Sequence, residues 1–536
     1  MLEEEIMQNQ SNIKDVDTVT SYNNIPYFIL DDELSRASVS EYNAEMNEIV
    51  TLYRKYKKGA EFLTEGSNAD YIPSDLRFKK ASTIINKEAR FMFSNPPTFN
   101  INIDDVDNSM KEQNAILQDL LDVVLKRNNF NAKISKAIKD CLIGKRVAAV
   151  LNFNEDSGIT ITFLNSMEFI YEFSSEDENK LIRFVCFYNM KVTNDKTEQR
   201  WFKKTYELEN DTVYLTENIY DGLGELLEKV TERTAIELPY IPAVIILNDG
   251  LIGDLKGTSE LGYILDYESY YSKLSNADHD AERKSMNPIK YTIDASQEST
   301  SNLSNAPGSF WDIQSDESKS EYSKASVGMM EANMSYSSAL KTTLDRIENA
   351  MYSEVDVPNI TSEQLQGVIT SGKTLKALYW GLTTRCNEKM LVWGPAFEFI
   401  ARTIILGSLL YPNIAKKYTE DKIPDIDYKI LVENNYALPE DEESEKTLDI
   451  AEVDAKLMSK KAYLKKWRKL NDKEADEELK QIKLEMDLFD NSSMPMNFGY
   501  EMNASGGIDN YNNHQIHQDD EEDNQNNDDN KINNQV

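Results

Sequence analysis

Two long helical patterns in the middle of the chain constrain its fold more than any other feature. Residues 258–286 and 328–354 each predict one helix of about 27 residues, or roughly 40 Å at 1.5 Å per residue. Both patterns are too polar to bury a core of their own. Long, weakly apolar helices of this kind are usually covered by copies of themselves or by a partner. We therefore expect this pair of helices to be covered in an assembly.

The segment between the two helices predicts a small β lobe at the end of a helical stalk. Two strand-like stretches, Ile289–Ile293 and Ser309–Ile313, are separated by a loop rich in Ser, Asn, Pro and Gly. Phe310 and Trp311 in the second stretch are large apolar side chains that would suit an exposed docking surface. Ordinary strand packing is the alternative interpretation of the same two residues.

The chain on the N-terminal side of this region mixes helices with a run of short strands. The stretch "SDLRFKKASTIINKEARFMF" predicts a helix with Leu76, Ile84 and Phe91 on one face. Short β-branched and aromatic segments, separated by Asn, Asp, Gly and Ser turns, predict an antiparallel meander over 146–222. The other elements expected here are a strand in "TFNINI" and helices over 31–58, 108–128 and 130–144.

The chain on the C-terminal side is mostly helical. In the long pattern "LKALYWGLTTRCNEKMLVWGPAFEFIARTIILGSLL", Gly394-Pro395 predicts a kink. The end of the chain, 491–536, is rich in Asn, Asp and Gln and lacks the apolar residues that offset the entropy of ordering, so we predict a disordered acidic tail. The other elements expected here are a strand in "DIDYKILVENN" and helices over 438–457, 459–470 and 473–489.

The charge balance is strongly acidic. The 536 residues contain 58 Lys and Arg against 93 Asp and Glu, a formal net charge of −35. This excess argues against a protein that holds nucleic acid by neutralising its phosphates. An acidic surface can still face DNA where DNA must slide, because like charges across water repel weakly and leave no sites for counter-ion exchange.

The sequence contains few residues of the types that catalysis and metal binding use, so we expect no catalytic residue, metal or cofactor. No Cys-x-x-Cys pair occurs, and two of the three histidines lie in the terminal tail. The N-terminus is acidic rather than signal-like, and no apolar run reaches about 18 residues, so no membrane span is expected. The residues concerned are Cys141, Cys186, Cys386, His279, His514 and His517.

The octapeptide "GVITSGKT", residues 367–374, fits the phosphate-binding pattern G-x-x-x-x-G-K-[ST]. A phosphate loop requires a buried strand leading into its first Gly, but the stretch upstream, "VPNITSEQLQ", is polar and contains Pro358. A magnesium-binding acid after four apolar residues is also missing downstream. The segment is better interpreted as a Gly-containing turn that ends at the N-cap of the long helix.

The order of these elements resembles that of the portal proteins of tailed bacteriophages, of the long-tailed type. Three stretches carry the likeness locally: "EARFMFSNPPTFNI", "CLIGKRVAAVLNFNEDSGITITFLNSMEFIYEF" and "SEVDVPNITSEQLQGVITSGKTLKALYWGL". The first is similar to the family's helix that ends in aromatic residues and is stopped by a Pro. The second is similar to its segment in which a Gly precedes a strand, a polar turn and a second strand. The third is similar to its stretch of Val-Pro, a polar run and Ser-Gly before the start of a helix. The resemblance covers most of residues 30–490.

This resemblance implies an α+β, mainly α, elongated subunit that assembles into a ring, typically of twelve copies, at one capsid vertex. DNA would pass through its channel during packaging and ejection. The implied regions are an N-terminal arm (1–30), a wing (31–256), a stem helix (257–287), a clip (288–327), a second stem helix (328–356), a tunnel loop (357–372), a kinked helix with a wing strand (373–435), crown helices (436–490) and the acidic tail (491–536).

The resemblance also implies where DNA meets the chain. The tunnel loop and its end contain Gln366, Thr370, Ser371, Gly372 and Lys373. Lys373 stands where the family usually has an apolar residue. Double-stranded DNA would pass without sequence specificity. The implied protein partners are terminase, a head-completion or adaptor protein, and capsid and scaffold proteins, with the ring in the virion and in the host cytoplasm during assembly.

Two basic residues of the second long helix, Lys341 and Arg346, would offer weak phosphate contacts in such a channel. Pairing with Asp345 and Glu348 is the alternative. Two other functions also stay open. One is a P-loop ATPase of the packaging motor, and the other is an acidic capsid scaffold or adaptor, which should be mostly helical and lack the meander over 146–222.

Overall fold

The computed structural model shows a mixed fold with more helix than strand. In the described part of the chain, helices hold more residues than strands, which confirms the α+β class. The chain divides into two compact units, Met1–Asp441 and Glu442–Val536, which are described separately. The described residues are 36–490, except for 63–71, 104–107, 287–288, 304–310, 319–323, 331–333, 361–375, 437–441 and the single positions 178, 192, 302, 317, 469 and 471.

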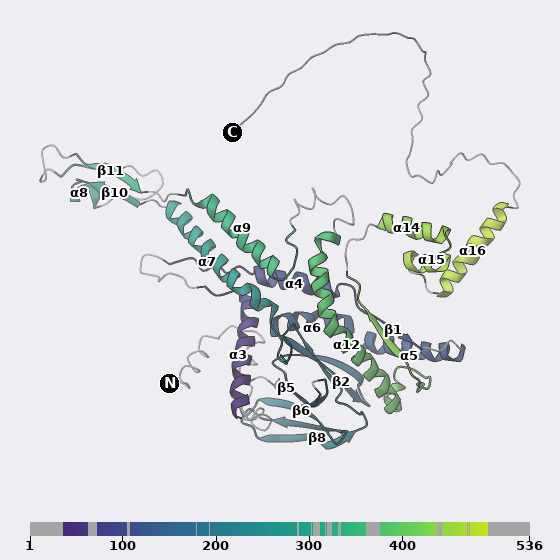
Figure 1. Ribbon diagram of the computed structural model, residues 1–536. Helices are drawn as coiled ribbons and strands as arrows, with labels where there is room; N and C mark the ends of the chain where they lie inside the picture. Colours follow the sequence, from purple (N-terminus) through teal and green to yellow (C-terminus); the bar gives the residue numbers. More distant parts are fainter. Residues whose placement is uncertain are drawn as a thin grey trace, which may run out of the picture. The chain divides into compact units, whose positions relative to one another are not determined.

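Several helices of the larger unit, labelled in Figure 1, contribute to one apolar core. The helices expected over 108–128 and 130–144 are confirmed as α5 and α6, and Asn129, in the left-handed conformation, separates them. The helices around this core are α3 (Arg36–Lys58), α4 (Lys80–Phe93), α5 (Asn108–Arg127), α6 (Phe130–Gly144), α12 (Trp380–Leu410) and α13 (Pro412–Ala415).

The strands between α6 and α7 form two antiparallel sheets rather than one meander over 146–222. In the first sheet β2 lies between β3 and β9, and the second runs from β4 to β8 in sequence order. A shared apolar cluster, with Ala148 and Val150 from the first sheet and Phe169 and Phe184 from the second, joins them. The strands are β2 (Arg146–Asn154), β3 (Gly158–Asn165), β4 (Phe169–Phe173), β5 (Leu181–Lys191), β6 (Arg200–Glu209), β7 (Thr212–Tyr220), β8 (Leu226–Ile236) and β9 (Ala243–Leu247).

Strand β8 lies beyond the end expected for the meander. It is an edge strand that pairs with β7, and most of its side chains are exposed. Its sequence, "LLEKVTERTAI", therefore lacks the alternation that identifies a half-buried strand. A further two-stranded sheet pairs β1 (Thr98–Asn102) with β12 (Lys429–Glu433), which confirms both of these predicted strands.

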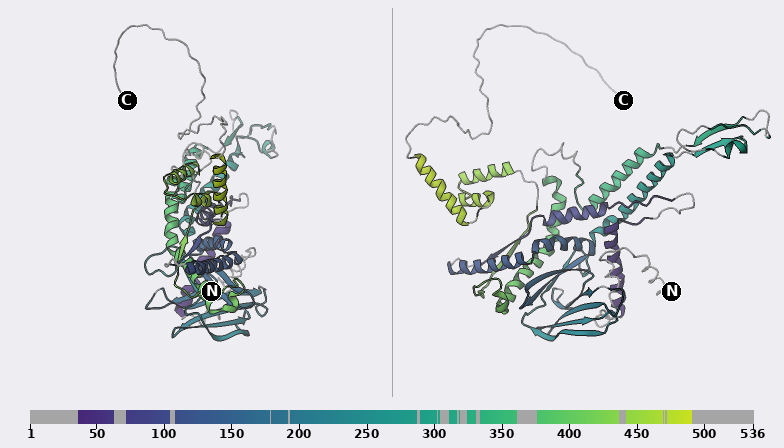
Figure 2. Two further views of the ribbon diagram at one scale, coloured as in Figure 1. Left: turned by 90° about the vertical axis from the view of Figure 1, so that its right-hand side faces the viewer. Right: turned by 180° about the vertical axis from the view of Figure 1, so that it is seen from behind.

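Helices α7 (Glu260–Met286) and α9 (Ser337–Glu354) lie side by side (Figures 1 and 2). The prediction over 258–286 is confirmed by α7. The prediction over 328–354 is wrong at its start, because α9 begins only at Ser337.

The residues before α9 instead complete a two-stranded sheet. Strand β11 (Ser326–Met330) pairs antiparallel with β10 (Ile289–Ile293), and Gly328 lies opposite Tyr291. A Cβ on Gly328 would lie 2.3 Å from the Tyr291 ring, so a larger residue here would require that exposed ring to move. The predicted second strand, Ser309–Ile313, is therefore wrong in its described part, since residues 311–313 form no strand.

The segment before α4 corrects another prediction. The helix expected from Ser74 begins only at Lys80. Side chains of α7 bind this segment instead: the Ser74 N–H donates to Asp280 (3.0 Å), and the Leu76 N–H donates to Asn276 (2.8 Å). The Asn276 side chain also donates to the Leu76 carbonyl (2.7 Å), which a helix starting at Ser74 would use for its own hydrogen bond. Leu76, expected on the apolar face, is 51% exposed as a result.

Replacing Asn276 by Ala should lower the free energy of unfolding by about 1–3 kcal/mol. The buried Asn276 amide binds both the N–H and the carbonyl of Leu76, so its loss leaves these groups without partners. Chemical denaturation followed by circular dichroism measures the change. Asn43→Ala on the exposed face of α3 is the control, with an expected change within about 0.5 kcal/mol. Equal losses in the two variants would contradict this role of Asn276.

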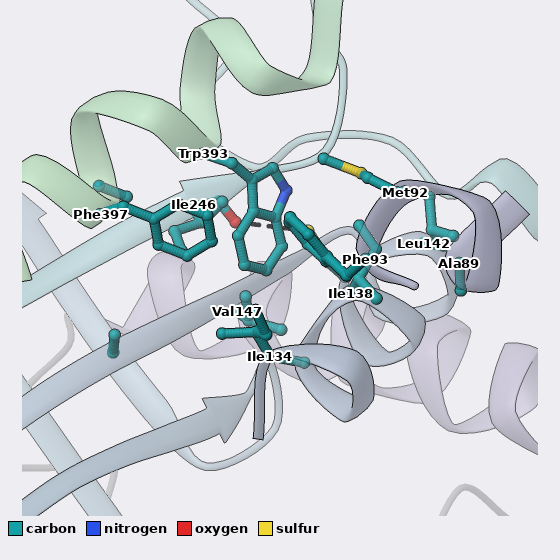
Figure 3. Close-up of a cluster of buried hydrophobic side chains, with 14 of the residues drawn as sticks. Ala89, Met92, Phe93, Ile134, Ile138, Leu142, Val147, Ile246, Trp393 and Phe397 are labelled. Atoms are coloured by element: carbon teal, nitrogen blue, oxygen red, sulfur yellow. Dashed lines mark hydrogen bonds between the residues drawn. The ribbon is translucent and has the colours of Figure 1, made fainter. Parts of the chain in front are cut away.

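The core of the larger unit is centred on aromatic residues from α4 and α12 (Figure 3). Trp393 is 1% exposed and meets the Phe93 ring edge-on at 5.2 Å and the Phe397 ring at 5.6 Å. Val147 of β2 and Ile246 of β9 belong to the same cluster. Helix α12 is thereby fixed against α4 and the first sheet.

Helix α12 continues through Gly394-Pro395 with Pro395 inside it, and the kink expected there stays a prediction. Among the described helices, α12 is the one that is long and apolar enough to cross a membrane by length and composition. Half of its apolar window is buried within the subunit, and Trp393, Phe397 and Ile400 belong to the core. We therefore interpret α12 as the core helix of this unit.

The smaller unit confirms the three helices expected after residue 436. The Trp467 indole N–H donates to Asp449 (2.7 Å), which Lys466 also binds (2.7 Å). Arg468 of the second helix binds Glu478 of the third at 2.6 Å. The helices are α14 (Glu442–Asp454), α15 (Lys460–Arg468) and α16 (Asp472–Asp490).

Candidate functional site

Helix α9 exposes the two basic residues that the sequence analysis predicts to contact DNA. Lys341 and Arg346 both have exposed side chains. Met351 and Tyr352 are the buried residues of α9, and both lie in its last turns. Most of α9 therefore shows its side chains to solvent in a single chain, as expected for a helix that is covered in an assembly.

Polar contacts hold α9 antiparallel to α7. The Tyr336 hydroxyl donates to Asp278 (3.1 Å) near the start of α9, and the Tyr267 hydroxyl donates to Glu354 (2.9 Å) near its end. Leu261 and Ile264 of α7 and Met351 of α9 also belong to the apolar core of the larger unit, so apolar packing joins the two helices at this end.

The structure does not show the pairing of Lys341 and Arg346 with Asp345 and Glu348. Glu348 instead binds Lys80 of α4 at 2.8 Å. Within the described residues, no ion pair joins Lys341 or Arg346 to either acid. Both cations are therefore available to a partner outside the chain, and their contact with DNA stays a prediction.

The two-stranded sheet of β10 and β11 carries the candidate docking surface. Trp311 is half-buried, with the Lys290 ammonium 4.7 Å from its ring centre, and Phe310 lies outside the described residues. The sequence interpretation missed three exposed apolar side chains of β11, because it started a helix at residue 328 and expected no strand here: Val327, Met329 and Met330.

The residues predicted for the tunnel loop, Gln366, Thr370, Ser371, Gly372 and Lys373, lie outside the described residues. Their role stays a prediction.

The described residues before the octapeptide turn sharply and form no strand. Asp356 has a φ of 51°, in the left-handed region, directly after α9. Residues 357–360 are neither helix nor strand. This part of the chain therefore lacks the strand that a phosphate loop requires.

A buried cluster of charges joins the start of α7, the end of α9 and the first half of α12. Glu88 of α4 and Glu260 of α7 are fully buried. Both Arg385 and Lys389 of α12 bind Glu260 directly. The two cations lie farther from Glu88, at 3.6 Å each. Arg385 also faces Asp356, at 3.7 Å.

The sequence interpretation missed this cluster, whose members are far apart in the chain. A signal was present: Arg385 and Lys389 precede Trp393 and Phe397 at intervals of four residues, on one stripe of α12. A charged pair that continues an apolar stripe indicates buried ion pairs.

The two carboxylates of the cluster have different proton affinities. Burial and the nearby Glu260 charge raise the pKa of Glu88 to about 7. Burial also acts on Glu260, but Lys389 and Arg385 outweigh it and hold the pKa of Glu260 below its usual value. Glu260 is therefore the ionised partner of both cations, and Glu88 is the carboxyl that retains a proton into the neutral range.

The structure also places the cysteines and the other metal-ligand side chains that the sequence analysis considered. All three cysteines are buried free thiols, and burial raises the pKa of Cys141 and of Cys186 to about 12. No group of three or more His, Cys, Asp or Glu side chains with metal-ligand geometry occurs among the described residues.

The fold and these surfaces define a helix-rich structural subunit with an exposed pair of helices that ends in a two-stranded sheet. A family model described as "Phage portal protein, SPP1 Gp6-like" matches residues 37–487. Because the match covers most of the chain, the chain belongs to this family of phage portal proteins, which are virion components that serve genome packaging. No curated protein matches the chain significantly.

Proposed function

We propose that the chain is the subunit of a ring, probably of about twelve copies, that surrounds the DNA channel at one capsid vertex. Double-stranded DNA enters through this channel during packaging and leaves through it at ejection. The observation that supports the proposal most strongly is the family match over 37–487. The exposed length of α9 is consistent with it, since a long helix with so little buried surface is covered in a ring by neighbouring copies.

In this proposal α7 and α9 form the stem, and β10 with β11 forms the clip. The clip extends to Met330 rather than 327, because β11 ends there. The exposed side chains of Val327 and Met329, with the half-buried Trp311, form the surface that meets terminase and later the head-completion protein. Apolar patches rimmed by polar residues are typical docking surfaces. The helices α14–α16 form the crown, and capsid and scaffold proteins surround the ring.

The acidic character of the chain suits a channel that must not hold DNA. Few cations are available to bind phosphates, and on α9 these are Lys341 and Arg346. Such sparse contacts guide a polyanion without sequence specificity and release it readily. The ring acts in the virion, and its subunits are made in the host cytoplasm.

The structure disfavours one of the two other functions. An acidic scaffold was expected to lack strands over 146–222, but β2 to β7 lie there. The residues that lead directly into the octapeptide, 361–366, lie outside the described residues, so the rejection of a P-loop ATPase stays a prediction from the sequence.

Charge reversal at Lys341 and Arg346 tests the channel assignment. We expect the Lys341→Glu, Arg346→Glu variant to form rings, which electron microscopy checks, because the proposal places these two exposed side chains toward the channel rather than against a neighbouring copy. DNA packaging in a reconstituted reaction should fall several-fold, because phosphates would then face added negative charge.

The matched control reverses two exposed lysines of the five-stranded sheet, Lys191→Glu and Lys229→Glu. This control has the same net charge, and its packaging should stay near that of the natural chain. An equal loss in both variants would show a general charge effect and contradict the placement of α9 in the channel.

A further inference from the structure

The buried cluster between α4, α7 and α12 contains one carboxyl group whose surroundings do not match a charge. Glu88 is completely buried, and neither of its side-chain oxygens has a hydrogen-bond partner in the described part of the chain. Arg385 and Lys389 lie 3.6 Å away, beyond hydrogen-bond distance, and both form hydrogen bonds to Glu260. An ionised carboxylate left in this position would be strongly destabilising.

The cluster also connects the start of α7 and the end of α9 to α12. Glu260 lies in the first turn of α7, and Asp356 lies directly after α9. Arg385 contacts both of these acids from α12, while Lys389 binds Glu260 and the Asn248 side chain (3.0 Å). The Arg385 guanidinium therefore contacts both the acid at the start of α7 and the acid after the end of α9.

We infer that Glu88 is a positioning residue that holds a proton in the assembled fold and thereby leaves Arg385 and Lys389 to Glu260 and Asp356. When Glu88 loses this proton, three acids compete for two cations. Arg385 then turns toward Glu88, and its contact with Asp356, the weakest at 3.7 Å, is lost first. The proton thus sets how firmly the end of α9 is attached to α12.

The neighbours of Glu88 determine the pH at which it loses its proton. Burial and Glu260 raise the pKa of Glu88 to about 7, against the opposing charges of Lys389 and Arg385. Burial raises the pKa of the nearby thiols, so they stay neutral and add no charge. The titratable and charged groups around Glu88 are Glu260 on α7, Cys141 on α6, Arg385, Cys386 and Lys389 on α12, and Asp356 behind Arg385.

The sign of the pH dependence follows from linkage. Between the ordinary carboxyl pKa and about 7, the folded chain holds a proton on Glu88 that the unfolded chain does not. Stability must therefore fall as the pH rises through this window. The Glu88→Gln variant stays neutral at every pH, so this contribution should vanish.

The test compares the full chain with Glu88→Gln from pH 5 to 8.5. The melting temperature of the natural chain should fall across this range relative to that of the variant. Amide exchange at residues 353–357, corrected for its intrinsic pH dependence, should rise several-fold with pH in the natural chain and stay constant in Glu88→Gln. Glu398→Gln, in an exposed pair with Arg402 on α12, is the control and should follow the natural chain.

A second variant keeps the inference testable if Glu88→Gln does not fold. Glu260→Gln removes the competing carboxylate, so Glu88 becomes the partner of both cations and the pH window should move to lower pH. The same pH profile in the natural chain and in the Glu88 or Glu260 variant would overturn the inference. These readouts need no DNA, so they are independent of the assignment of α9 to a DNA channel. That the attachment of α9 to α12 matters for a stem rests on the proposed function.

Discussion

Replacing Lys389 by Met should lower the free energy of unfolding of the larger unit by about 3–5 kcal/mol, because it removes one of the two cations bound to the buried Glu260 carboxylate. The Lys389 ammonium binds Glu260 and the Asn248 side chain, and the residue is 9% exposed. Glu260 would retain the Arg385 ion pair and the hydrogen bond that the Asn248 side chain donates (3.4 Å). Guanidinium denaturation followed by circular dichroism measures the loss.

The control for Lys389 is Lys229→Met on the edge strand β8. Lys229 forms an exposed pair with Glu232 at 3.7 Å, so its loss should change the free energy of unfolding by about 0.5 kcal/mol or less. If Lys389→Met lost no more unfolding free energy than this control, the buried cluster would not stabilise the contact between α7 and α12.

Replacing Trp393 by Ala should cost about 3–5 kcal/mol, because the cavity left by the indole cannot close against surrounding helices and strands. Trp393 packs on Phe93 and Phe397, which fix α12 against α4 (Figure 3). Thermal unfolding by calorimetry measures the effect. The variant should also lose the near-ultraviolet signal of the packed aromatic rings.

Trp380→Ala is the matched control for Trp393, since both residues belong to α12 and Trp380 is 73% exposed. We expect its unfolding free energy to stay within about 0.5 kcal/mol of the natural value. Similar losses at both positions would mean that α12 is not anchored by its buried aromatic face.

Elements with a strong local pattern were predictable from the sequence. The helices α5, α6 and α7 lie within two residues of their expected bounds, because their apolar spacing and stop signals act locally. The start of α4 was not predictable in this way, because its preceding residues bind side chains of α7 that come much later in the chain. Tertiary contacts overrode a sound helical pattern there.

Strands whose stability depends on distant pairing were the least predictable. Strand β11, "SVGMM", resembles a helix start by composition, and only its pairing with β10 places Gly328 against Tyr291. For the candidate site, the exposure of Lys341 and Arg346 followed from the polar pattern of α9. The buried cluster did not, because Glu88, Glu260 and the α12 cations meet only in the folded chain.

The most direct test of the proposed function is electron microscopy of the purified full-length chain, with its solution mass measured alongside. A closed ring with a central hole, and a mass that is a multiple of 61.5 kDa near twelve copies, is the result we predict. The pair α7 and α9 should line the hole. A uniform particle of 61.5 kDa without rings would contradict the central claim that this chain forms a channel by assembly.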